Sequence, residues 1–177
     1  NTASMKWDGA HTFFGDHANG ALPMWVADMD FKCSKEITNA MEQKLQEGIF
    51  GYPLLTDSYY QAVIHWMEKH YDWHVEKEWI QFSPGIVAAL NYIVQAFTKE
   101  GDSVLIQSPV YYPFTSAVVN NNRKIIRNNM LEEDQQYMID FDDFEKKIVQ
   151  KSVKMYILCN PHNPGGRVWT EDELVRL

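Results

Sequence analysis

Cysteine is scarce in this sequence: only Cys33 and Cys159 occur, far apart and in no spacing typical of a metal site. A disulfide-rich scaffold is therefore excluded, and we expect a reduced, cytoplasmic protein. Long apolar runs are missing too, since no stretch approaches the roughly 20 apolar residues that cross a bilayer. The opening NTASMKWDGAHTFF also lacks the basic-then-apolar order of a signal peptide. We therefore expect no membrane partner.

Positive charge is also in short supply. Lys and Arg number 16 against 24 Asp and Glu, which gives a formal net charge of -8. This balance disfavours nucleic acid and anionic membranes as partners. The sequence has neither a G-x-G-x-x-G motif nor a P-loop, so nothing indicates a dinucleotide or P-loop nucleotide site. A small anionic ligand is still compatible, because backbone amides can bind one in an acidic protein.

Helix and strand patterns alternate along the chain. Helices are predicted from a cap at Ser34 to Gly48, from Asp57 to Tyr71, from Gly85 to Lys99, from Phe141 to Gln150, and from about Glu171, after a capping box of Thr170 and Glu173. Short apolar runs predict strands at 79–83, 103–108, 124–129 and 154–159. The alternation predicts an α/β fold with a mostly parallel sheet flanked by helices. The helix at 85–99 is apolar on most sides, and we expect it to be buried.

The stretch NPHNPGG, residues 160–166, follows the last predicted strand and so lies at the edge of the sheet where ligands of open α/β folds bind. Its prolines fix the backbone, its glycines allow close approach, and the amides of Asn160 and Asn163 offer hydrogen bonds. The alternative is a plain turn whose asparagines cap their own backbone, which is the commoner case for a single motif. We expect His162 to be structural or solvated rather than catalytic.

Two other strand ends carry candidate binding groups. After the run at 79–83, the backbone amides of Gly85, Ile86 and Val87 open a helix and point outward with its positive dipole end, which suits a phosphate. After the strand at 103–108, the stretch SPVYYPF offers a flat tyrosine face to an aromatic ligand. The alternatives are an ordinary strand-to-helix turn and ordinary aromatic packing.

The connector FGYPLLTD contains Tyr52, which either offers its hydroxyl to a ligand or a neighbouring subunit, or packs as a surface tyrosine. Each of these signals is modest alone. Together they place a phosphate cradle, an aromatic plate and an amide donor at the ends of three strands. A planar, phosphorylated, hydrogen-bonding ring needs all three, and pyridoxal phosphate fits that description better than a nucleotide does.

Four stretches in combination carry a family resemblance: LPMWVADMDF (22–31), GIFGYP (48–53), SPVYYPF (108–114) and NPHNPGGRVW (160–169). With them the chain resembles the aspartate aminotransferase superfamily of pyridoxal-phosphate enzymes, of fold type I. Within it, the chain is most similar to the cystathionine β-lyase or C–S lyase branch, which includes the maltose-regulon modulator. The resemblance implies an incomplete large domain of a pyridoxal-phosphate-dependent transferase over residues 46–177. An N-terminal segment and part of a small domain would occupy residues 1–45.

The resemblance also assigns roles in cofactor binding. Asn163 is expected to hydrogen-bond the phenolic oxygen of the cofactor ring and to lie beside the substrate. Tyr111 is expected to stack on the ring, and the backbone amides of Gly85, Ile86 and Val87 to hold the phosphate.

Two residues of the N-terminal part receive roles in the same way. Tyr52 is expected to reach the phosphate in the other subunit, which implies a homodimer with shared active sites. Ala27 is expected to lie where the N-terminal segment passes the substrate.

Three groups that family members carry are not found in this sequence: the Schiff-base lysine, the aspartate under the pyridinium nitrogen and the arginine for the substrate carboxylate. In the family they follow the NP turn, so we expect them beyond Leu177 and expect no catalytic residue in this chain. The chain is then the N-terminal part of a longer protein and is inactive alone. Relatives often carry threonine at the position of Gly165, and we expect the glycine to leave the cofactor pocket looser.

For the complete protein, the resemblance implies a carbon–sulfur β-lyase acting on small cystathionine- or cysteine-type amino acids. Elimination across the α- and β-carbons would release pyruvate, ammonia and a thiol. An aminotransferase of class I or II is the first alternative, because both reactions begin with the same proton loss. A regulatory or binding protein that retains the fold is the second.

Overall fold

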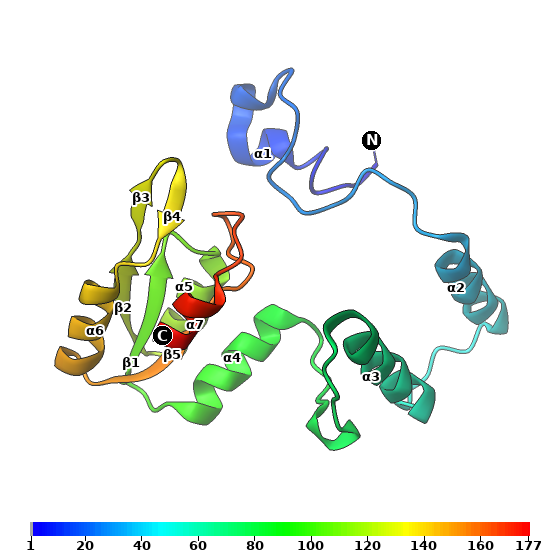
Figure 1. The fold of residues 1–177 in the computed structure, drawn as a ribbon. Helices are drawn as coiled ribbons and strands as arrows, with labels where there is room; N and C mark the ends of the chain where they lie inside the picture. Colours follow the sequence, from blue (N-terminus) through cyan, green and yellow to red (C-terminus); the bar gives the residue numbers. More distant parts are fainter. Residues whose placement is uncertain (1) are drawn as a thin grey trace. The chain divides into compact units, whose positions relative to one another are not determined.

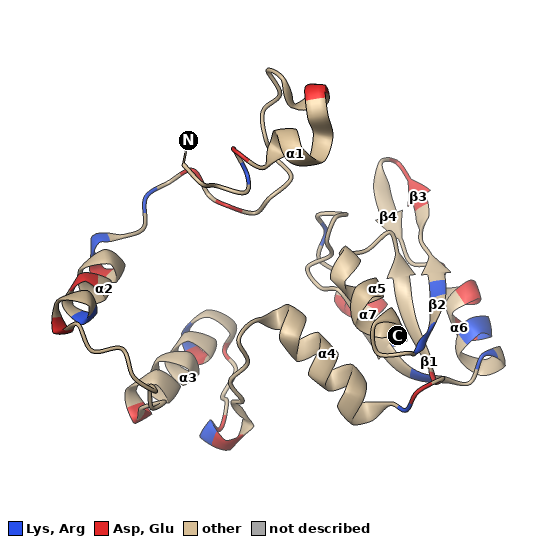
Figure 2. Cartoon of the chain, turned by 180° about the vertical axis from the view of Figure 1, so that it is seen from behind, with Lys and Arg blue, Asp and Glu red and all other residues tan. Residues whose placement is uncertain are grey.

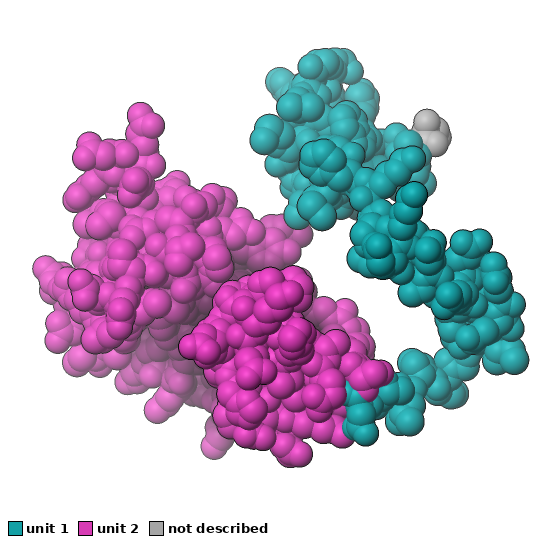
Figure 3. All heavy atoms as spheres, turned by 45° about the vertical axis from the view of Figure 1, so that its right-hand side comes forward, with its two compact units in different colours: residues 1–57 teal, residues 58–177 magenta. Residues whose placement is uncertain are grey.

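The computed structural model describes residues 2–177 and divides the chain into two compact units, which meet between Asp57 and Ser58 (Figure 3). The first unit contains the helix α1 (Ala10–Phe14), the 3-10 helix η1 (Gly15–Ala18) and the helix α2 (Lys35–Glu47). The second contains the sheet. None of the helices in the described part of the chain is long and apolar enough to cross a membrane.

In the first unit, a buried lysine organises the N-terminal segment. Lys6 Nζ donates to the Asp28 carbonyl at 2.8 Å and to Asp30 Oδ2 at 2.7 Å, and its side chain is only 7% exposed. The Trp25 indole donates to the Lys6 carbonyl at 3.1 Å, and its ring packs 5.2 Å from that of Phe14. The buried ammonium is stable because it is paired with a carboxylate and a carbonyl.

Helix α2 confirms the predicted helix between Ser34 and Gly48. Ser34 is the N-cap residue, and Gly48 ends the helix in the left-handed conformation with φ 66°, which glycine adopts without a Cβ penalty. Within this unit the apolar stripe of the helix is exposed, since Met41 and Leu45 are 68% and 67% exposed.

The second unit is built on a parallel three-stranded sheet of order β2-β1-β5 (Figure 1). Its elements are α3 (Asp57–Tyr71), η2 (Lys77–Trp79), α4 (Ile86–Phe97), β1 (Ser103–Ser108), α5 (Tyr112–Val119), β2 (Lys124–Asn129), β3 (Leu131–Glu133), β4 (Gln136–Met138), α6 (Phe141–Gln150), β5 (Val153–Ile157) and α7 (Glu171–Arg176). The predicted α/β class with a parallel sheet flanked by helices is confirmed. So are the strands at 103–108 and 124–129 and the helix at 141–150.

Helices cover both faces of this sheet (Figure 1). Ile106 of β1 is buried in one cluster with Leu90 and Val94 of α4 and with Phe114 of α5. Successive strand residues point to opposite faces, so Leu105 lies on the other side, in register with Tyr156 of β5. Phe144 of α6 packs edge-on against the Tyr156 ring at 5.0 Å. The central strand is therefore buried on both faces, as is usual for parallel sheets.

The predicted strand at 79–83 is wrong for this structure. Lys77–Trp79 forms a 3-10 turn, and residues 80–83 pair with no strand in the described part of the chain. A strand is stable only when its backbone groups bond to a neighbour. An apolar run alone does not supply that neighbour.

The prediction that the helix at 85–99 is buried is also wrong. Helix α4 packs one side against α5, where Leu90 and Val94 are buried, whereas Ile86 and Phe97 are 75% and 74% exposed. The helix carries no Lys, Arg, Asp or Glu (Figure 2). Its outer face is therefore apolar as well.

The hairpin β3–β4 and the helix α5 have no counterpart among the predictions. The hairpin β3–β4 turns at Asp134 and Gln135, both with positive φ, at 48° and 62°. Such a turn is usually signalled by Asn-Gly or Asp-Gly, and this one has neither. Helix α5 is short and begins with Tyr112 and a proline, so its pattern reads as a loop.

Candidate functional site

The candidate site lies in the second unit, where β1 and β5 end side by side. The two strands are parallel neighbours, so the segments that follow them emerge at the same edge of the sheet. The backbone N–H of Tyr111, after β1, donates to the carbonyl of Asn163, after β5, at 2.8 Å. The structure thus brings these two predicted site residues together through a main-chain bond.

Tyr111 is held on one side and open on the other. It is the N-cap residue of α5 and is half-buried against the core cluster of Ile106 and Phe114. Its ring lies 5.4 Å from that of Tyr112 and 6.4 Å, edge-on, from that of Phe114. A ring supported in this way can offer a face to a planar ligand without losing much conformational freedom.

Asn163 has a fixed backbone and an unused side chain. Its N–H donates to Cys159 Sγ at 3.3 Å, and its carbonyl accepts the bond from Tyr111. The carboxamide is exposed and makes no hydrogen bond within residues 2–177. It therefore offers one acceptor and two donors from a held position.

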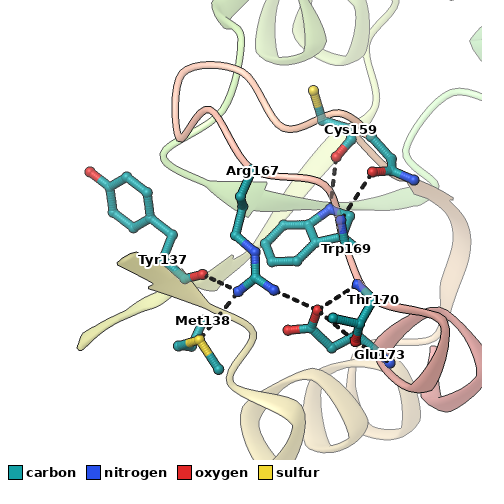
Figure 4. Close-up of polar contacts among 8 residues, drawn as sticks. Tyr137, Met138, Cys159, Arg167, Trp169, Thr170 and Glu173 are labelled. Atoms are coloured by element: carbon teal, nitrogen blue, oxygen red, sulfur yellow. Dashed lines mark hydrogen bonds and ion pairs between the residues drawn. The ribbon is translucent and has the colours of Figure 1, made fainter. Parts of the chain in front are cut away.

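Asn160 behaves differently from Asn163. Its Oδ1 accepts from the backbone N–H of Trp169 at 3.2 Å, and the Trp169 indole donates to the Cys159 carbonyl at 2.8 Å (Figure 4). The ordinary role of an asparagine in a turn, bonding to nearby backbone, thus applies to Asn160.

The start of α4 has the geometry expected of an anion site. Gly85 precedes the helix with φ 138°, a conformation that side chains rarely tolerate, and Ser83 Oγ donates to its carbonyl at 3.0 Å. Ile86 and Val87 are exposed, and the first amides of a helix have no partner within it. One turn further on, Leu90 enters the core cluster against which Tyr111 packs, so the helix start and Tyr111 share one support.

His162 is a structural residue. Only 2% of it is exposed, and its ring lies 6.3 Å from that of Tyr137 and 5.4 Å from that of Trp169. Nδ1 accepts from the Gly165 N–H at 3.1 Å, which requires the neutral ring. Burial lowers the pKa of His162, and the nearby Arg167 charge acts in the same direction.

The His162 ring packs against Gly165 in the space that a side chain at position 165 would need. A Cβ at position 165 would lie 2.6 Å from His162 Nδ1 and 2.8 Å from Tyr137 Cδ2. Real Cβ atoms do not approach other atoms so closely. The space that a side chain would need is therefore filled by the packing of the turn itself.

The two remaining predicted residues lie in the first unit. Tyr52 is fully exposed, and Ala27 is exposed immediately before the segment held by Lys6. Their roles stay predictions. No cluster of His, Cys, Asp or Glu suited to a metal ion occurs in the described residues.

Arg167 and Trp169 hold the turn but were not predicted from the sequence. Arg167 bonds to Tyr137 of β4, whereas Trp169 bonds to Cys159 at the start of the same loop. The predicted capping box of Thr170 and Glu173 is confirmed.

This chain resembles known proteins both in sequence and in structure. Residues 23–177 match the family described as aminotransferase class I and II. Cystathionine beta-lyase PatB from Bacillus subtilis is 49% identical over 99% of this chain and 45% of its own length. A PLP-bound putative aminotransferase from Clostridium difficile 630 superposes with a TM-score of 0.91 at 42% identity, and cystalysin from Treponema denticola with 0.90 at 41%. Both structures are covered to 45% and this chain to 99%. The chain thus spans about half the length of its relatives.

The burial of His162 predicts a pH-dependent loss of stability. Because its folded pKa lies below the ordinary value of about 6.5, only the unfolded chain takes up this proton as the pH falls through that value. His162→Asn keeps an acceptor for the Gly165 N–H but cannot titrate. We expect its free energy of unfolding to fall less than that of the wild type between pH 7 and pH 5, by at most about 1.4 kcal/mol per pH unit.

Urea denaturation of the full-length protein at the two pH values measures this difference. His65→Asn, at an exposed position on α3, controls for loss of a histidine and should match the wild type. Parallel pH dependences in the His162 variant and the wild type would contradict the prediction.

The packing around Gly165 predicts that a side chain there is costly. Gly165→Ala should lower the free energy of unfolding by about 1–3 kcal/mol, as overpacking typically does. Gly51→Ala is the matched control, because a Cβ there meets nothing within 4 Å. Thermal unfolding of both full-length variants checks the prediction, which fails if their midpoints fall equally.

Proposed function

This chain belongs to the aminotransferase class I and II family, and we propose that the full-length protein is a pyridoxal-phosphate-dependent carbon–sulfur β-lyase. Its substrates are small cystathionine- or cysteine-type amino acids. The observation that carries the proposal is the main-chain bond between the Tyr111 N–H and the Asn163 carbonyl, which joins the ends of β1 and β5. The 49% identity to a cystathionine beta-lyase supports the lyase over other reactions of the family.

The residues present fit pyridoxal phosphate. The free amides at Gly85, Ile86 and Val87 suit its phosphate, since α4 itself brings no charge that would repel an anion. The ring of Tyr111 suits its pyridine face, and the unused carboxamide of Asn163 suits its phenolic oxygen. When bound, the cofactor acts as an electron sink for the bonds at the substrate α-carbon.

In this proposal the residues of this chain hold the cofactor and adjust the charge on its ring, and none of them forms a covalent bond with it. The Asn163 amide would donate to the phenolic oxygen and so favour its anionic form. Tyr111 would pack against the pyridine ring. The lysine that would hold the cofactor belongs, in this proposal, to sequence beyond Leu177.

Two residues of the first unit, Ala27 and Tyr52, have roles in this proposal. Lys6 fixes the carbonyl of Asp28 and the side chain of Asp30, and so fixes the chain direction next to Ala27. Tyr52, with its phenol fully exposed, is available to the cofactor phosphate of a second subunit. The active form in this proposal is a homodimer with shared sites.

An aminotransferase of the same family is the second candidate, favoured by the 42% identity to a protein described as a putative aminotransferase. The products decide between the two. We expect the full-length protein with cystathionine to release pyruvate, ammonia and a free thiol without any keto-acid acceptor. A thiol-specific dye and a lactate dehydrogenase-coupled assay measure them. Product formation that depends on a keto acid and yields a new amino acid would make the protein an aminotransferase.

The role of Asn163 predicts a spectroscopic change. Asn163→Ala removes a hydrogen bond to a charged oxygen, worth about 1.5–3 kcal/mol, so the pH midpoint of the cofactor absorbance change should rise by about one unit or more. An absorbance titration of the cofactor-loaded full-length protein measures it. Asn39→Ala, on the exposed α2, should leave the midpoint in place. An unmoved midpoint in Asn163→Ala would remove this residue from the site.

A further inference from the structure

Arg167 connects the turn that contains Asn163 to β4 and to α7. Arg167 Nη1 donates to the Tyr137 carbonyl of β4 at 2.7 Å and approaches Met138 Sδ at 3.2 Å, while Nη2 donates to Glu173 Oε2 of α7 at 2.6 Å (Figure 4). Its guanidinium also lies 4.5 Å from the centre of the Trp169 ring. We propose that Arg167 is a positioning residue that sets the place of the Asn163 carboxamide through the turn.

The connection from Arg167 to Asn163 is short. The Arg167 carbonyl accepts from the His162 N–H at 2.7 Å, and the His162 carbonyl accepts from the Gly166 N–H at 2.8 Å. These two main-chain bonds close the turn next to Asn163. A displacement of residue 167 is therefore transmitted to residue 162, the neighbour of Asn163, through one hydrogen bond.

The ion pair between Arg167 and Glu173 is partly buried, so we expect it to contribute to the stability of the turn. The side chains of Arg167 and Glu173 are 18% and 12% exposed, so water screens them less than an ordinary surface pair. Glu173 Oε2 also accepts from the Thr170 N–H at 2.8 Å, which couples the pair to the start of α7. Removing either partner leaves the other charge half-desolvated, which is costlier than losing an exposed pair.

The contacts require an arginine. One nitrogen of the guanidinium donates to β4 and another to α7, while its central carbon lies over the Trp169 indole ring. A lysine ammonium keeps the charge but lacks the planar fork and the flat face. Arg167→Lys should therefore hold the turn only in part.

We call the contacts of Arg167 with Tyr137 and Glu173 the clamp. Hydrogen exchange tests whether the clamp holds the turn, and this test does not rely on the proposed function. In the full-length Arg167→Met variant, the amides of His162 and Gly166 should exchange at least tenfold faster than in the wild type, and in Arg167→Lys by an intermediate factor. Arg176→Met is the matched control, because Arg176 also lies over an aromatic ring, that of Phe141 at 4.1 Å, but does not hold the turn. Unchanged exchange at both amides in Arg167→Met would overturn the clamp.

The positioning role rests on the proposed function and has its own measurement. In the cofactor-loaded protein, Arg167→Met should raise the pH midpoint of the absorbance change in the same direction as Asn163→Ala, but by less. The double variant should match Asn163→Ala alone, since both changes act through one carboxamide. Arg176→Met should match the wild type.

The outcomes separate two failures. A midpoint that moves in Asn163→Ala but not in Arg167→Met overturns the positioning role and leaves the function intact. An unmoved midpoint in Asn163→Ala, with fast exchange in Arg167→Met, overturns the assignment of Asn163 and with it the positioning role, and leaves only the clamp. If Arg167→Met does not fold, Glu173→Gln replaces it. Glutamine keeps the acceptor for the Thr170 N–H but removes the charge, and the same shifts are expected at smaller size.

Discussion

The main-chain bond between the Tyr111 N–H and the Asn163 carbonyl is the contact on which the candidate site depends. It forms because β1 and β5 are parallel neighbours, so the segments that follow them leave the sheet at one edge. Both strands are covered by helices, which fixes their register and hence the relative height of the two segments. A backbone bond of this kind places the two residues whatever their side chains do. The side chains are then free to meet a ligand.

The turn after β5 uses its polar groups unequally. Three side chains stabilise the turn itself: the amide of Asn160 and the rings of His162 and Trp169. The His162 imidazole is neutral and buried. Of the two asparagines in the turn, Asn163 is the one whose side chain makes no hydrogen bond with the described residues. Preorganisation of this sort is valuable in a binding site, because the protein has already met the entropy cost of ordering the donor. Arg167 connects the turn to β4 and α7 through its hydrogen bonds to Tyr137 and Glu173.

The two units differ in how much of their apolar surface is covered. In the second unit β1 is fully enclosed, whereas the outer side of α4 and the stripe of α2 in the first unit expose large apolar side chains. Large exposed apolar faces usually mark surfaces that another element or another chain covers. The exposed faces are consistent with a chain that spans about 45% of its relatives' length. The proposed homodimer would cover further surface around Tyr52.

The sequence by itself determined the class of the fold, the elements from β1 onward that have clear periodicity, and the identity of the groups suited to a phosphorylated ring. These follow from local rules, such as the spacing of apolar residues in α6 and the reciprocal cap of Thr170 and Glu173. Tertiary structure decided which of those groups are available. Whether residues 80–83 become a strand depends on a pairing partner, and the burial of α4 depends on what packs against it. The hydrogen bond of Asn160 depends on Trp169, and that of Arg167 depends on the β3–β4 hairpin. Local periodicity carries no information about such contacts, because they join segments that the chain brings together only by folding.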